Sequence, residues 1–189
     1  MKNFSQIITE HLSDKVQNGY GPVYDSILKN LRHKPLNILE IGIGTVIPDA
    51  PSNMAWQGGN YRPGASLRAF KEYFPNAMIY GGDIQDDCMF EEPRIKTFKF
   101  DSTNLSQCNA ALMDMTFDII IDDGLHTTPA QLKTFRNLWH RVNDGGFYFM
   151  EDVWSPLYEE WQTAFGDIDA EKWDYKSNSA KYTFIVFSK

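Results

Sequence analysis

Apolar residues form short runs that alternate with amphipathic stretches along most of the chain. Buried strands of a parallel sheet are apolar on both faces, so runs rich in β-branched and aromatic residues predict such strands. The runs are LNILEIGIG, AMIYGGDI, RIKTFKFD, FDIIIDDG and FYFMEDV. Between them, segments 66–73, 105–113 and 129–142 have the pattern of helices. This alternation predicts a parallel sheet with helices on both faces.

The two ends of the chain depart from this alternation. Apolar positions at helical spacing predict helices within residues 3–31 that lead into the fold. After a helix expected near 156–164, WDYKS and YTFIVFS predict two strands that form an antiparallel hairpin at one edge. We therefore expect an α/β fold with a mostly parallel seven-stranded sheet. The chain is expected to be one domain over 1–189, with N-terminal helices over about 1–34 and the core over about 35–189.

Composition and charge narrow the range of partners. The formal net charge is −7, and Lys and Arg do not cluster, whereas nucleic-acid binding needs clustered cations. Small molecules and metal ions are therefore the expected partners. Cys88 and Cys108 lack the spacing of a zinc site or a disulfide framework, which indicates buried or surface thiols. Because we find neither a signal peptide nor an apolar run of about 18 residues, we expect a cytoplasmic protein without a membrane span. A homo-oligomer is compatible with the sequence.

Carboxylates stand at the end of every early predicted strand. Ligands of open α/β sheets bind outside the carboxyl ends of the strands, so these acids are expected around one crevice. Like charges crowded there require cations or hydrogen-bond donors. The residues are Glu40, Asp83, Asp101, Asp122, Asp123, Glu151 and Asp152.

Two glycines after the first predicted strand allow a tight turn and a close approach of the backbone to a ligand. Gly42 and Gly44 are not followed by the third glycine of the G-x-G-x-x-G motif, so a dinucleotide-dependent dehydrogenase fits poorly. Asp83 is instead placed to accept hydrogen bonds from ribose hydroxyls. Asp101 is placed to accept one from the exocyclic amine of adenine.

The ordered set LEIGIG, GGDI, FKFD, FDIIIDDGLH and GGFYFMEDV resembles class I methyltransferases. Within that class it resembles the metal-dependent O-methyltransferases that act on sugars of macrolide and related antibiotics. The resemblance covers about residues 13–153 and includes SDK at 13–15 and ASLRAF at 65–70. It implies a Rossmann-like fold, S-adenosylmethionine as cofactor, Mg²⁺, and a hydroxyl of a glycoside or other small metabolite as methyl acceptor.

The resemblance also implies roles for individual residues. The cofactor-binding set is Glu40, Gly42, Gly44, Ser66, Arg68, Asp83, Asp101 and Asp122. The Mg²⁺ ligands are Asp123, Glu151 and Asp152. His126 is expected to act as general base, with Asp123 as the second catalytic residue. A hard divalent cation on these carboxylates would bind a vicinal diol and make one of its hydroxyls easier to deprotonate.

Each of these residues also has a structural interpretation. His126 can be a helix-capping or hydrogen-bonded histidine, and Asp122 and Asp123 can cap the following helix. Trp56, Tyr61 and Trp154 can line a substrate lid or act as packing anchors. His11, His33 and His140 lie away from the strand ends, and we interpret them as solvated surface groups.

Two other functions remain open at this stage. The first is a metal-independent methyltransferase with another acceptor, such as a carboxylate, a phenol or an amine. The second is a catalytically silent domain that binds S-adenosylmethionine. The identity of the acceptor depends on the Pro- and Gly-rich segment 46–64 and on the N-terminal helices. The sequence pattern does not show which side chains of these segments would contact the acceptor.

Overall fold

The protein is described by a computed structural model that covers residues 1–154, 171–176 and 182–189. These residues build one sheet, in which the five central parallel strands pair in the order β4-β2-β1-β5-β6. The strands are β1 (Asn37–Ile41), β2 (Met78–Asp83), β4 (Ile95–Lys99), β5 (Phe117–Asp122) and β6 (Val142–Trp154). The parallel core of the fold is thus confirmed.

Three further strands extend the sheet at its edges. β8 (Tyr182–Ser188) pairs antiparallel with β6, and β7 (Glu171–Lys176) pairs antiparallel with β8. This is the C-terminal hairpin that the sequence predicts. At the opposite edge, the two-residue strand β3 (Glu91–Glu92) pairs antiparallel with β4 and adds one strand to the seven expected. The expected helix near 156–164 and the turn of the hairpin lie outside the described residues.

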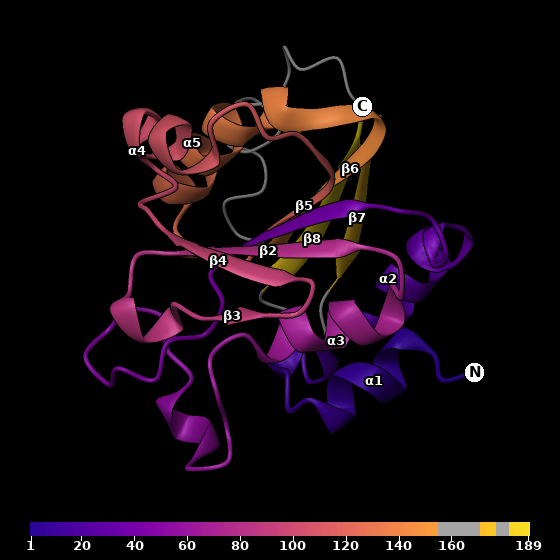
Figure 1. The fold of residues 1–189 in the computed structure, drawn as a ribbon, viewed down its shortest axis with the longest axis horizontal. Helices are drawn as coiled ribbons and strands as arrows, with labels where there is room; N and C mark the ends of the chain where they lie inside the picture. Colours follow the sequence, from indigo (N-terminus) through magenta and orange to yellow (C-terminus); the bar gives the residue numbers. More distant parts are fainter. Residues whose placement is uncertain (155–170, 177–181) are drawn as a thin grey trace.

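Helices cover both faces of the sheet (Figure 1). α1 (Phe4–Glu10), α2 (Gly21–Leu28) and α3 (Ala65–Tyr73) pack on one face, and α4 (Leu105–Leu112) and α5 (Thr128–Leu138) pack on the other. β5 shows why a strand needs helices on both sides. Ile119 and Ile121 pack in the core under α1, α2 and α3, and Ile120 packs in the core under α4 and α5. Successive side chains of a strand point to opposite faces, so its continuous apolar run requires cover on both sides.

Short 3-10 helices occupy several connections. They are η1 (Asp14–Val16), η2 (Lys29–Leu31), η3 (Ala55–Gln57), η4 (Asp86–Cys88) and η5 (Trp139–Arg141). The helix expected to reach residue 142 ends earlier, because η5 follows α5 and β6 already begins at Val142. Gly145 and Gly146, a pair of residues typical of a turn, lie within β6, where their backbone groups pair with those of Lys189 at 2.8 and 3.1 Å.

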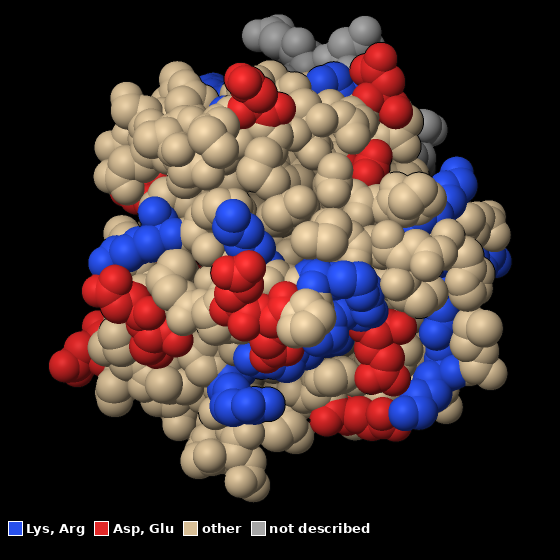
Figure 2. Space-filling view, in the orientation of Figure 1, with Lys and Arg blue, Asp and Glu red and all other residues tan. Residues whose placement is uncertain are grey.

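Neither cysteine takes part in a disulfide. Cys88 packs in the core beneath α3, and Cys108 packs in the core beneath α4, where burial raises its pKa to about 11. Acidic and basic side chains are intermingled on the face seen in Figure 2. In the part of the chain that the structure describes, no helix has the length and apolar character needed to cross a membrane.

The turn after β1 brings two strand ends into direct backbone contact. Gly42 adopts a φ of +79°, and its backbone lies against the carbonyl of Asp123 and the Cα of Gly124. A Cβ at this position would overlap both groups. Gly145 has a similar φ of +75°, but nothing lies within 4 Å of where its Cβ would stand. Substitution of Gly145 therefore measures the free-energy cost of a side chain at positive φ alone. Substitution of Gly42 adds the cost of steric overlap with the backbone of the β5 turn.

We expect Gly42→Ala to destabilise the fold more than Gly145→Ala. The control substitution should cost about 1–2 kcal/mol, because it adds only a side chain at positive φ. Gly42→Ala should cost about 1–3 kcal/mol more, because backbone atoms of the β5 turn must also move. Urea unfolding of the two variants measures the difference. Equal losses would show that the β1 and β5 turns are not held in contact.

Candidate functional site

A cavity of about 370 Å³ lies over the carboxyl ends of β1, β2, β4 and β5. Its walls come from the turns that follow these strands, from the segment 50–54 and from the N-terminal segment. Residues of these turns that line it include Gly42, Gly44, Asp83, Asp101 and Asp123. Sequence reasoning placed the ligand site at this edge of the sheet, and the structure has its cavity there.

Two of the predicted cofactor-binding acids face this cavity with carboxylates fixed by the local backbone. Asp83 accepts hydrogen bonds from the backbone N–H groups of Ile43 and Gln85 at 3.0 and 2.9 Å. Asp101 accepts from the N–H of Thr103 at 2.9 Å and from its hydroxyl at 2.7 Å. The remaining lone pairs of both carboxylates are free to accept further hydrogen bonds from a ligand.

Glu40 and Arg68 do not line the cavity, in contrast to Asp83 and Asp101. Glu40 is fully buried, accepts a hydrogen bond of 2.6 Å from Ser66 and lies behind the cavity wall. Ser66 itself reaches the cavity. Arg68 turns away from it, because its guanidinium pairs with Glu92 at 2.8 Å and stacks over the ring of Phe90.

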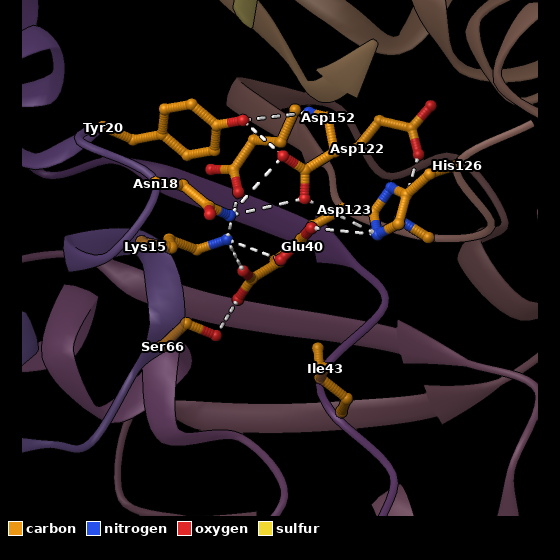
Figure 3. A network of polar contacts seen from close by, with 12 residues as sticks. Lys15, Asn18, Tyr20, Glu40, Ile43, Ser66, Asp122, Asp123, His126 and Asp152 are labelled. Carbon is orange, nitrogen blue, oxygen red and sulfur yellow. Dashed lines mark hydrogen bonds and ion pairs between the residues drawn. The ribbon is translucent and has the colours of Figure 1, made fainter. Parts of the chain in front are cut away.

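A buried lysine joins the acids of three strand ends (Figure 3). The ammonium of Lys15 lies 3.0 Å from Glu40, 2.7 Å from Asp123 and 2.7 Å from Glu151. Its side chain is 1% exposed. Burial lowers the pKa of Lys15, but the three carboxylates outweigh burial and hold its pKa well above the usual value. The resemblance includes Lys15 within the SDK segment, but the sequence does not predict its role as counter-ion of the acids, because a lysine in a polar segment normally lies at the surface.

The two acids that follow Met150 point in different directions. Glu151 is buried, and its carboxylate accepts hydrogen bonds from Lys15 and from the hydroxyl of Tyr24. The pairing of β6 with β8 shifts register between Met150 and Val153, and Asp152 adopts a φ of 50° there. Such a bulge re-aims side chains. It directs Asp152 toward Tyr20 and Asn18, which donate to its carboxylate.

Asp123, His126 and Asp152 form a group that can hold a metal ion. One ligand atom from each residue lies within 4.8 Å of the others, and the group is partly exposed. His126 Nε2 lies 3.7 Å from Asp123 Oδ1 and 3.9 Å from Asp152 Oδ2. The Nδ1 atom of His126 is buried, and it has no hydrogen-bond partner among the described residues. Carboxylate oxygens with an imidazole nitrogen are a suitable donor set for a divalent cation.

Asp122, the last residue of β5, points to the opposite face of the sheet from Asp123. It is buried, accepts a hydrogen bond of 3.1 Å from Tyr148, and burial raises its pKa to about 7. Asp122 thus contacts the core beneath α5, whereas Asp123 contacts Lys15. The assignment of Asp122 to the cofactor site stays a prediction, as does the assignment of Glu151 to the metal site.

The aromatic candidates divide between cavity and surface. Tyr61 is 9% exposed and lines the cavity beside Gly44. Trp56 and Trp154 are more than half exposed, so they stand at the surface of the described structure. His33 and His140 are exposed as expected, while His11 is only partly exposed and lies 2.9 Å from Glu72.

Comparison with known proteins identifies relatives among the antibiotic sugar methyltransferases, although no protein-family model matches the chain. The chain is 36% identical over 160 residues to demethylmacrocin O-methyltransferase of Streptomyces fradiae, a match that covers 84% of this chain and 37% of the relative. It is 32% identical over 164 residues to 8-demethyl-8-(2-methoxy-alpha-L-rhamnosyl)-tetracenomycin-C 3'-O-methyltransferase of Streptomyces olivaceus, with 81% and 37% covered.

A solved structure gives the same result. The MycE methyltransferase of the mycinamycin biosynthetic pathway, in complex with Mg and SAH, superposes with a TM-score of 0.70 at 28% identity. The match covers 85% of this chain and 39% of that chain. The chain is a homologue of these class I methyltransferases. This methyltransferase homologue spans less than two fifths of the length of the curated relatives described above.

The buried Lys15 of the methyltransferase homologue should be essential for stability. We expect Lys15→Met to lower the free energy of unfolding by about 3–5 kcal/mol, because it leaves several buried carboxylates without their cation. The matched control is Lys99→Met, since Lys99 pairs with Asp86 at the surface at 2.6 Å. The control should lose about 1 kcal/mol at most.

Urea unfolding at neutral pH measures both variants. The double variant Lys15→Met/Glu151→Gln should be more stable than Lys15→Met alone, because it removes one of the uncompensated charges. A loss for Lys15→Met no larger than that for Lys99→Met would contradict the role assigned to the buried cluster.

Proposed function

We propose that this chain carries the catalytic site of an S-adenosylmethionine-dependent O-methyltransferase that acts on a hydroxyl of a glycoside or similar small metabolite. One observation carries the proposal: a single cavity extends from Asp83 and Asp101 to Asp123, beside the Asp123, His126 and Asp152 group. The homology to O-methyltransferases of antibiotic sugars favours the same reaction.

The proposed cofactor lies across the strand ends. Asp101 would accept a hydrogen bond from the adenine amine, and Asp83 would accept from the ribose hydroxyls. The glycine turn after β1 forms the cavity wall between these acids and β5, and its close packing requires glycine, because a Cβ at Gly42 would overlap Asp123 and one at Gly44 would overlap Tyr61. This arrangement directs the reactive end of the cofactor toward β5.

The proposed metal ligands are Asp123 and Asp152, which stand on the side of the site nearest His126. The two carboxylates approach each other beside Nε2 of His126, and their negative charges fit a cation at this place. Glu151, the third carboxylate of the expected set, would reach the cation only if it exchanged its contact with Lys15.

The reaction needs alignment and removal of a proton. S-adenosylmethionine would supply an electrophilic methyl group and leave as S-adenosylhomocysteine, and Mg²⁺ held by Asp123 and Asp152 would make a hydroxyl of the acceptor a better nucleophile. His126 accepts the hydroxyl proton at Nε2, the ring nitrogen nearest Asp123 and Asp152. Asn18 and Tyr20 keep Asp152 in position through their hydrogen bonds.

Two substitutions separate the cofactor end from the metal end. Asp83→Asn should weaken binding of S-adenosylhomocysteine at least about tenfold, because it replaces an ionised acceptor of the ribose hydroxyls. Asp123→Asn should leave this affinity within about threefold and abolish methyl transfer to glycoside acceptors. Calorimetric titration and initial-rate assays measure the two effects. Equal loss of cofactor affinity in both variants would show that Asp123 is misassigned, and failure of the unmodified protein to bind the ligand would overturn the proposed function.

His126→Gln tests the general base. We expect kcat to fall about 100-fold or more while S-adenosylhomocysteine and Mg²⁺ still bind, since a glutamine cannot accept the proton. His33→Gln, at an exposed histidine, should leave the rate unchanged. A parallel loss of Mg²⁺ affinity in calorimetry would instead identify His126 as a metal ligand. Full activity in the presence of EDTA would favour the metal-independent alternative.

A further inference from the structure

An acid of the N-terminal segment faces the cavity beside the glycine turn. Asp14 lines the cavity together with Gly42, Gly44 and Tyr61. It is the first residue of η1 and immediately precedes Lys15, which anchors this short helix in the buried cluster. The position of Asp14 in the cavity wall is thus fixed by the fold.

Glu40 is less able to serve a ligand at this place. Although it lies within β1 next to the glycine turn, it is 0% exposed, and its carboxylate accepts a hydrogen bond from Ser66 and pairs with Lys15. A positively charged group over the glycine turn would therefore meet the carboxylate of Asp14 and not that of Glu40. The resemblance includes Glu40 in the cofactor-binding set, but a sequence pattern does not show which of the two acids lines the cavity.

The direction of the cavity shows which end of the ligand reaches Asp14. With adenine at Asp101 and ribose at Asp83, the ligand enters over β4 and β2 and continues over β1 toward β5. The part beyond the ribose therefore lies over the turn after β1. Asp14 stands on this side, since it lines the same cavity as Asp123 and directly precedes Lys15, whose ammonium lies 2.7 Å from Asp123.

We propose that the carboxylate of Asp14 binds the α-ammonium group of the methionine part of the cofactor. The inference rests on the proposed function, because it takes the cavity to be the S-adenosylmethionine site. The pairing is chemically suitable: an ammonium group donates three hydrogen bonds, and a partly buried carboxylate without such a partner is penalised by desolvation. That burial raises the pKa of Asp14, with the charge of Asp123 as the next cause.

Two ligands that differ only beyond the ribose and its sulfur provide the test. S-adenosylhomocysteine carries the amino-acid group, and 5′-methylthioadenosine lacks it. We expect Asp14→Asn to weaken S-adenosylhomocysteine at least about tenfold and to change the affinity for 5′-methylthioadenosine by less than about twofold. Asp83→Asn is the matched comparison and should weaken both ligands to a similar extent. Calorimetric titration of the full chain measures all four affinities.

The outcomes distinguish this inference from the function on which it rests. Unchanged binding of S-adenosylhomocysteine by Asp14→Asn, or equal weakening of both ligands, would overturn the role of Asp14 while leaving the cofactor site in place. Weakened Mg²⁺ binding with unchanged S-adenosylhomocysteine binding would also overturn it. If the unmodified protein bound neither nucleoside, the proposed function itself would fail. Circular dichroism and urea unfolding show whether Asp14→Asn is folded.

Discussion

The contact of Lys15 with Glu40, Asp123 and Glu151 is the constraint on which the site depends. These acids come from three neighbouring strands, and the lysine comes from a segment far away in sequence. Without the ammonium, several carboxylates would share a space from which water is largely excluded, which is strongly unfavourable. The N-terminal segment must therefore dock on the sheet. Docking brings Asp14 to the cavity and places Asn18 and Tyr20 against Asp152.

The strands and helices could be predicted because their burial follows simple periods. A run such as FDIIID is apolar at consecutive positions, so it needs cover on both faces, and the structure provides α-helices on both. The start of β6 could not be predicted in this way. Gly145 and Gly146 suggest a turn, but their pairing with Lys189 draws them into the strand. That contact joins residues distant in sequence, so no local pattern reports it.

The positions of the acids were easier to predict than the directions of their side chains. Asp83 and Asp101 face the cavity because backbone N–H groups hold each carboxylate. Each acid accepts from the turn that follows it, and Asp83 also accepts from Ile43 in the turn after β1. Asp122 and Asp123 are neighbours, yet the first contacts Tyr148 and the second contacts Lys15. The two-residue period of a strand anticipates such a divergence. The bulge that turns Asp152 carries no glycine to mark it, and Lys15 gives no sign in sequence of being buried.

The distribution of charge suits the two different cations of the proposed function. Lys15 neutralises the innermost acids. The acids that reach the cavity or its rim either make no ion pair with this lysine or share it with other acids. Asp14 stands over the glycine turn, while Asp123 and Asp152 stand beside His126. A sulfonium cofactor and a divalent cation repel each other, and separate anionic groups lower the energy of binding both. The buried Lys15 thereby divides one acidic crevice into two places of different chemistry.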